Sequence, residues 1–129
     1  MQDISNYLVK PDTRLRDVIE VIGRNMDGIA IVTNENGSLA GTITDGDIRR
    51  YILADGSLDI PCKAIMSPDP KTAPANFTNQ QLISLMQQYR LVNLPVISNE
   101  RKPLSVVHLR DLLTRFGRED RVAVIMAGG

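Results

Sequence analysis

Tryptophan is absent from this 129-residue sequence, and only three tyrosines and two phenylalanines are present, so a hydrophobic core must be built from aliphatic side chains. The single cysteine, Cys62, excludes an internal disulfide bond. Fifteen basic and fifteen acidic residues cancel, which leaves no global field to recruit nucleic acid or an anionic membrane. We therefore expect a protein that binds neither nucleic acid nor membranes.

Long apolar runs and targeting signals are also missing from the sequence. No apolar run approaches the ~20 residues that span a bilayer, and the first residues lack the basic and then apolar layout of a secretory signal. A cytoplasmic location is expected. His108 is the only histidine, and no cysteine or carboxylate cluster lies at ligand spacing around it, so the sequence predicts no metal site.

What the sequence does contain is an internal repeat. The segment 41–50, which reads GTITDGDIRR, recurs in weakened form 64 residues later as SVVHLRDL at 105–112. The apolar segment 28–35 recurs at nearly the same spacing as 93–100. The order of these segments is the same in both copies, so one structural unit has been used twice.

Each copy predicts a helix, a strand, a turn, a strand and a second helix. Turn residues at 34–37 and 99–103 lie between short apolar runs, which is typical of hairpins. Apolar side chains at helical spacing precede the hairpins, at Leu15, Val18, Ile19 and Ile22 and at Leu82, Leu85, Met86 and Tyr89. A second apolar stripe follows each hairpin, at Ile48, Tyr51 and Ile52 and at Leu112, Leu113 and Phe116. The proline-rich connector 54–74 separates the copies and carries apolar residues, so we expect it to be ordered.

These features together resemble a tandem pair of cystathionine-beta-synthase (CBS) domains. The resemblance rests on the order of elements, the motif Gly41-x-x-Thr44-x-x-Asp47, the run 94–97 (LPVI) and the segment 64–70 (AIMSPDP). It implies an α/β (α+β) fold with two CBS repeats, each a small three-stranded sheet with two helices, packed about a pseudo-twofold axis.

The resemblance also implies two clefts that adenine nucleotides occupy in such proteins. In that family the hydroxyl at the Thr44 position meets a phosphate or ribose oxygen, and the carboxylate at the Asp47 position accepts from ribose hydroxyls. Gly41 lets a ligand approach the backbone, and the helix that begins near Asp47 turns its positive end toward a phosphate. Helix capping by Thr44 and Asp47 is the alternative explanation and is compatible with binding. The nucleotide-binding residues predicted in the first copy are Gly41, Thr42, Thr44, Asp47, Arg49 and Arg50.

The second copy departs from the motif. Ser105 replaces the glycine and His108 replaces the hydroxyl residue, while Asp111 is retained. We predict a nucleotide site there with His108, Arg110 and Asp111, in which the imidazole donates to a phosphate or stacks on a ring. The alternatives are a histidine without a ligand and a surface salt bridge for Arg110. The expected ligand is AMP, ADP or ATP, held reversibly, and a guanine nucleotide or S-adenosylmethionine remains open.

Two other functions fit parts of the sequence. Asp45 and Asp47 after an apolar run resemble the nucleophile motif of haloacid-dehalogenase-type phosphatases, but that family has Thr or Val where Arg49 stands, and it needs a parallel doubly wound sheet. A non-binding dimerisation module with filled clefts is the other alternative.

The last residues carry a further resemblance. Residues 121–129 (RVAVIMAGG) read as a buried strand that runs into a glycine-rich turn, and they resemble the opening of sugar-phosphate nucleotidyltransferases of the mannose-1-phosphate guanylyltransferase-like branch. The chain then divides into a first repeat at 1–60, a second repeat at 61–118 and the start of a truncated nucleotidyltransferase at 119–129. We expect this chain to be non-catalytic, to regulate that enzyme, and to form a homodimer through the stripes that follow each hairpin.

Overall fold

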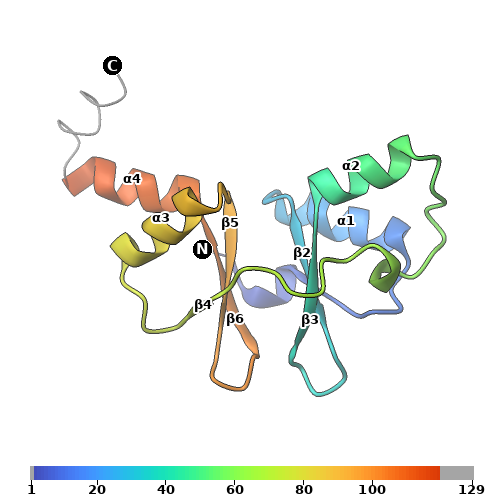
Figure 1. Ribbon diagram of the computed structural model, residues 1–129, viewed down its shortest axis with the longest axis horizontal. Coiled ribbons are helices and arrows are strands. Elements are labelled where there is room, and N and C mark those ends of the chain that lie inside the picture. The colour runs from blue at the N-terminus through green and yellow to red at the C-terminus, as the bar shows by residue number, and fades with distance from the viewer. Residues whose placement is uncertain (1, 120–129) are drawn as a thin grey trace.

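The computed structural model describes residues 2–119 and the side chains of residues 2–114, and it shows two similar units side by side (Figure 1). The first unit consists of η1 (Ile4–Asn6), β1 (Leu8–Val9), α1 (Leu15–Asn25), β2 (Ile29–Thr33), β3 (Leu39–Thr44) and α2 (Asp45–Leu53). The second consists of β4 (Ala73–Pro74), α3 (Asn79–Gln88), β5 (Asn93–Ile97), β6 (Pro103–His108) and α4 (Leu109–Glu119), and η2 (Cys62–Ala64) lies in the connector. The predicted fold class is confirmed.

The two sheets have the same topology and the same register. Their strand orders are β1-β2-β3 and β4-β5-β6, with the short first strand parallel and the hairpin antiparallel. Val9 pairs with Val32, and the residues 64 positions later, Ala73 and Val96, pair in the same way. We call two residues 64 positions apart counterparts. The sequence repeat is therefore also a repeat of the backbone structure.

Helix α1 begins without a side-chain cap, and the connector supplies the missing acceptors. The N–H groups of Leu15 and Arg16 donate to the carbonyl oxygens of Ile60 and Leu58 at 2.9 and 3.0 Å. The first N–H groups of a helix have no partner within the helix, so these bonds satisfy donors that would otherwise be unpaired. The connector is thus an ordered part of the first unit, as predicted.

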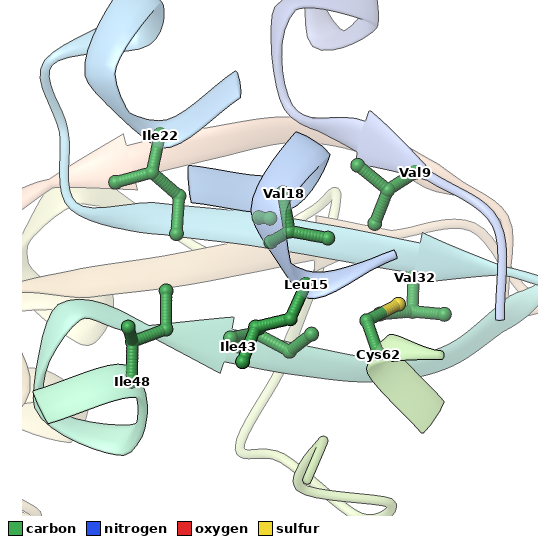
Figure 2. Packing of buried hydrophobic residues seen from close by; sticks show 9 residues of the cluster. Val9, Leu15, Val18, Ile22, Val32, Ile43, Ile48 and Cys62 are labelled. Atoms are coloured by element: carbon green, nitrogen blue, oxygen red, sulfur yellow. The ribbon is translucent and has the colours of Figure 1, made fainter. Parts of the chain in front are cut away.

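Each unit has its own aliphatic core between its sheet and its helices, which agrees with the scarcity of aromatic residues. Figure 2 shows the first core, in which side chains of α1 and α2 meet those of the sheet and Cys62 enters from the connector. A third cluster lies between the units and contains Tyr7, Ile29, Ile31, Leu39 and Val106. This cluster joins the two units into one molecule.

The predicted dimer stripes need one correction. Ile48 and Leu112 are buried in the cores of their own units, because the first turns of α2 and α4 pack against the sheets, and neither residue can contribute to an outer surface. Among the described side chains of these helices, the exposed apolar ones are Ile52 and Leu113, which belong to the predicted stripes, and Leu53. The side chain of Phe116 lies outside the described side chains, and the predicted strand 122–126 lies outside the described residues.

No helix in the described range 2–119 is long and apolar enough to cross a membrane.

Candidate functional site

The connector lies directly against the glycine of the first motif. Thr42 and Ser67 form a β-bridge, with N–H to carbonyl distances of 3.1 and 2.8 Å. A Cβ atom on Gly41 would lie 2.5 Å from the Ser67 carbonyl oxygen and 2.9 Å from the Met66 sulfur. Gly41 and Thr42 are both buried. The glycine therefore leaves room for the connector, whereas the prediction from the sequence was that it leaves room for a ligand.

Thr44 and Asp47 form a complete capping box at the start of α2. The Thr44 hydroxyl accepts from the Asp47 N–H at 3.2 Å, and the Thr44 N–H donates to the Asp47 carboxylate at 3.0 Å. Arg50 donates to the other carboxylate oxygen at 2.6 Å. The Asp47 side chain is about a quarter exposed. A carboxylate has about four lone-pair positions, so Asp47 keeps the capacity to accept from a ligand while it caps the helix.

The arginines of the first motif differ in their surroundings. Arg50 is tied to Asp47 and its side chain is largely exposed, and Arg49 is exposed. A cation that the sequence analysis did not single out is Lys71, whose ammonium lies 4.3 Å from the centre of the Tyr89 ring. Lys71 is the counterpart of Tyr7, which lines the second cleft, so alignment of the two repeats marks Lys71 as a candidate for the first site.

The second cleft is a cavity of about 300 Å³ between the N-terminal segment, the Asp27 loop and the start of α4. Arg110 and Asp111 of the second motif are brought together there. Its lining residues are Gln2, Tyr7, Asp27, Val106, Arg110 and Asp111. The first three belong to the first repeat, so the cleft is built across both repeats.

Asp27 is the centre of the polar network in this cleft. Its side chain is only one-tenth exposed, and it accepts from the Tyr7 hydroxyl at 2.5 Å, from Gln2 at 3.3 Å and from Arg110 at 3.4 Å. Arg110 also lies 3.7 Å from the Asp111 carboxylate. Burial raises the pKa of Tyr7, and its hydrogen bond to the negative Asp27 raises that pKa further, so the phenol remains a protonated donor.

His108 takes the capping position in α4 that Thr44 takes in α2. Its Nδ1 accepts from the Arg110 N–H at 3.0 Å. The imidazole lines a separate cavity of about 350 Å³ between α3, α4 and the sheet, in which Ser105 and Asp111 also lie. His108 and Arg110 thus line different cavities, and Asp111 lines both.

The phosphatase alternative loses its structural basis. Asp45 lies at the first position of α2, where its N–H donates to the Gly28 carbonyl oxygen at 3.0 Å, and Asp47 caps the same helix. The sheets are small and mixed rather than parallel and doubly wound. Among the described residues, no group of three or more His, Cys, Asp or Glu side chains is placed to hold a metal ion.

The chain belongs to the CBS domain family, which its sequence matches over residues 3–54 and 62–118. It is 33% identical over 104 residues to an arabinose 5-phosphate isomerase, KpsF, of Escherichia coli O6:H1. The matched segment covers 80% of this chain and 32% of that protein. The chain spans about a third of the length of the first curated relatives it matches.

Solved CBS structures have the same fold. A CBS domain protein from Pyrobaculum aerophilum complexed with AMP aligns with a TM-score of 0.75 at 17% identity, over 86% of this chain and 89% of that one. A CBS domain pair in complex with 5′-methylthioadenosine and S-adenosyl-L-methionine aligns with a TM-score of 0.78 at 17% identity, over 92% and 98%. At such low identity the likeness concerns the fold.

Proposed function

We propose that this CBS pair is a regulatory module that binds an adenine nucleotide, AMP, ADP or ATP, in the cleft built around Thr44 and Asp47. The observation that carries the proposal is the start of α2, where a hydroxyl, a carboxylate and the N-terminal end of a helix converge. The AMP complex of the solved relative supports an adenine nucleotide as the ligand.

Each side chain in this cleft has a proposed role. Asp47 accepts from the ribose hydroxyls, and Thr44 meets a phosphate or ribose oxygen. Lys71 supplies a positive charge to the phosphate, and Arg49 and Arg50 are further phosphate donors. Gly41 and Thr42 shape the strand beneath. In the second cleft, His108, Arg110 and Asp111 remain the proposed ligand contacts from the second motif.

Calorimetry with AMP on wild-type protein and on Asp47→Ala tests this site. Losing charge-assisted hydrogen bonds to the ribose costs about 1.5–3 kcal/mol, or roughly ten- to a hundred-fold in affinity. Asp47→Asn keeps an oxygen that can cap the helix and should lose affinity while remaining folded. Asp17→Ala, which removes a first-turn carboxylate from α1, is the matched control. Unchanged affinity in a folded Asp47 variant would remove this residue from the site.

The enzyme that the module regulates is a separate proposal. Residues 121–129 favour a sugar-phosphate nucleotidyltransferase as that enzyme. They lie outside the described range, and the isomerase relative does not support that choice. The full reading frame would distinguish a nucleotidyltransferase from an isomerase. A second glycine-rich phosphate loop with acidic metal ligands beyond residue 129 would support the transferase, and their absence would end that proposal. We expect the 129-residue chain alone to have no transferase, phosphatase or hydrolase activity.

A further inference from the structure

The second cleft has an unusual charge arrangement for a phosphate-binding site. Two carboxylates, Asp27 and Asp111, and one guanidinium, Arg110, line it. Arg110 lies between the two carboxylates, 3.4 Å from Asp27 and 3.7 Å from Asp111. Asp27 is nine-tenths buried and also accepts from Tyr7. The formal charge of the lining is therefore negative, and its one cation is already paired.

The counterparts of these lining residues have different chemistry. The counterpart of Asp27 is Leu91, and the counterpart of Tyr7 is Lys71. A buried carboxylate is thus replaced by an apolar side chain and a phenol by an ammonium group. Only the motif carboxylate is common to both, as Asp47 in the first cleft and Asp111 in the second.

We propose that the two clefts select different adenosine ligands: the second takes a phosphate-free adenosine compound whose 5′ substituent is neutral or positively charged, and the first takes the phosphate-bearing nucleotide. This inference rests on the proposed function. A phosphate in the second cleft would face two carboxylates, of which Asp27 is nine-tenths buried. Turning Arg110 from Asp27 to that phosphate would leave the buried carboxylate with only its hydrogen bonds to Tyr7 and Gln2, which is unfavourable.

A neutral or cationic ligand meets no such penalty. Asp111 can accept from ribose hydroxyls as Asp47 does, and a sulfonium or ammonium group on the 5′ side would add a favourable charge interaction with Asp27. The ion pair between Arg110 and Asp27 can then stay intact while the ligand binds. The same arrangement therefore favours one ligand class and opposes the other.

Titration of the 129-residue chain with adenosine, AMP and S-adenosylmethionine, followed by backbone amide NMR, tests the inference. Adenosine and AMP differ only in the phosphate. At the amides of Arg110 and Asp111 we expect adenosine to bind at least about ten-fold more tightly than AMP, and S-adenosylmethionine to bind at least as well as adenosine. At Thr44 and Asp47 we expect AMP to bind more tightly than adenosine.

Three variants sharpen the test. Asp27→Asn removes the buried charge and should raise AMP affinity in the second cleft about ten-fold, with adenosine affinity changed less than about two-fold. Asp55→Asn removes the same charge at an exposed turn and should change neither. Lys71→Gln, at an exposed position where folding is not at risk, should lower AMP affinity in the first cleft and leave adenosine affinity unchanged.

The wild-type comparison alone can overturn the inference. Equal or tighter binding of AMP at Arg110 and Asp111 contradicts it, as does the absence of any shift there with adenosine and S-adenosylmethionine. An absence of AMP shifts at Thr44 and Asp47 contradicts the proposed function instead. The two failures are therefore distinguishable in one set of spectra.

Discussion

Gly41 shows how a single residue can be required by packing at a position that a ligand motif also explains. Its missing Cβ leaves room for the Ser67 carbonyl oxygen, which belongs to the backbone and cannot rotate away. The first motif therefore has two structural roles. Gly41 leaves space for the connector, and Thr44 and Asp47 cap α2. Binding would be added to these roles rather than replace them.

Gly41→Ala should therefore destabilise the protein by about 1–3 kcal/mol, because the added methyl group forces the connector away from β3. Gly23→Ala is the matched control, since Gly23 lies in helix α1 and a Cβ there would meet nothing within 4 Å. That change should stabilise the fold by about 0.5–1 kcal/mol. Urea unfolding measures both, and equal effects of the two substitutions would contradict this account of Gly41.

Cys62 should make stability fall at alkaline pH. Burial raises the pKa of its thiol from 9.0 to about 11, and the thiol donates to the Lys10 carbonyl oxygen at 3.1 Å. A raised folded-state pKa gives stability that is complete below the unfolded-state pKa and is lost as pH rises through the folded-state pKa. Stability should therefore drop by on the order of 2 kcal/mol between about pH 9 and 11. Urea unfolding of Cys62→Ala should show a flatter pH dependence, and parallel curves would refute the assignment.

At the scale of elements, the two capping boxes provide a way to separate structure from binding. Thr78 and Gln81 cap α3 as Thr44 and Asp47 cap α2, with hydroxyl to N–H distances of 3.2 Å in both. Thr78→Ala should cost about 1 kcal/mol of stability and leave AMP affinity unchanged. Thr44→Ala should cost a similar amount of stability and also weaken AMP binding. Equal AMP affinity in the two variants, measured by calorimetry, would assign Thr44 to capping alone.

The elements themselves were largely predictable from the sequence. Helical spacing, hairpin turns and the repeat predicted helices α1 to α4 and both hairpins. The spacing of Thr44 and Asp47 predicted the capping box. The two-residue strands β1 and β4 came only through the family resemblance, because two residues carry no periodicity.

The cleft residues were predicted only in part, for a physical reason. Arg110 and Asp111 follow a recognisable motif, but Tyr7 and Asp27 reach the same cavity from the other repeat, far away in the sequence. No local pattern marks them. The exposure of Asp27 and its ion pair with Arg110 depend on how the two units pack, and that packing is a property of the tertiary structure.

At the scale of the whole molecule, the two units are held together by apolar and polar contacts. Besides the shared cluster around Tyr7 and Val106, the Asn93 amide donates to the Asp27 carbonyl oxygen at 2.6 Å, and the Leu39 N–H donates to that of Arg101 at 2.7 Å. The Asp27 backbone thus anchors the seam between the units while its side chain lines the second cleft. Binding there would act on the same seam.

A homodimer is the prediction for the outer surface. Helices α2 and α4 lie at opposite ends of the molecule (Figure 1), and they expose Ile52, Leu53 and Leu113 to 46%, 78% and 42%. Two-fold pairing would bury each patch against its own copy or its pseudo-equivalent. Light scattering at micromolar concentration should give a dimer, and Leu53→Glu should give a monomer. Leu104→Glu, an exposed change on β6, should leave the dimer intact. A wild-type monomer would contradict the prediction.

The connector also sets the order in which this protein can fold as it is synthesised. The matched first domain ends at residue 54, yet its core includes Cys62. The carbonyl oxygens of Leu58 and Ile60 also accept hydrogen bonds from the first N–H groups of its first helix, α1. A nascent chain that has emerged only to residue 54 therefore has an open core and unpaired helix donors. The first unit becomes complete only when residue 67, which lies inside the second matched segment 62–118, has left the ribosome and bridged β3.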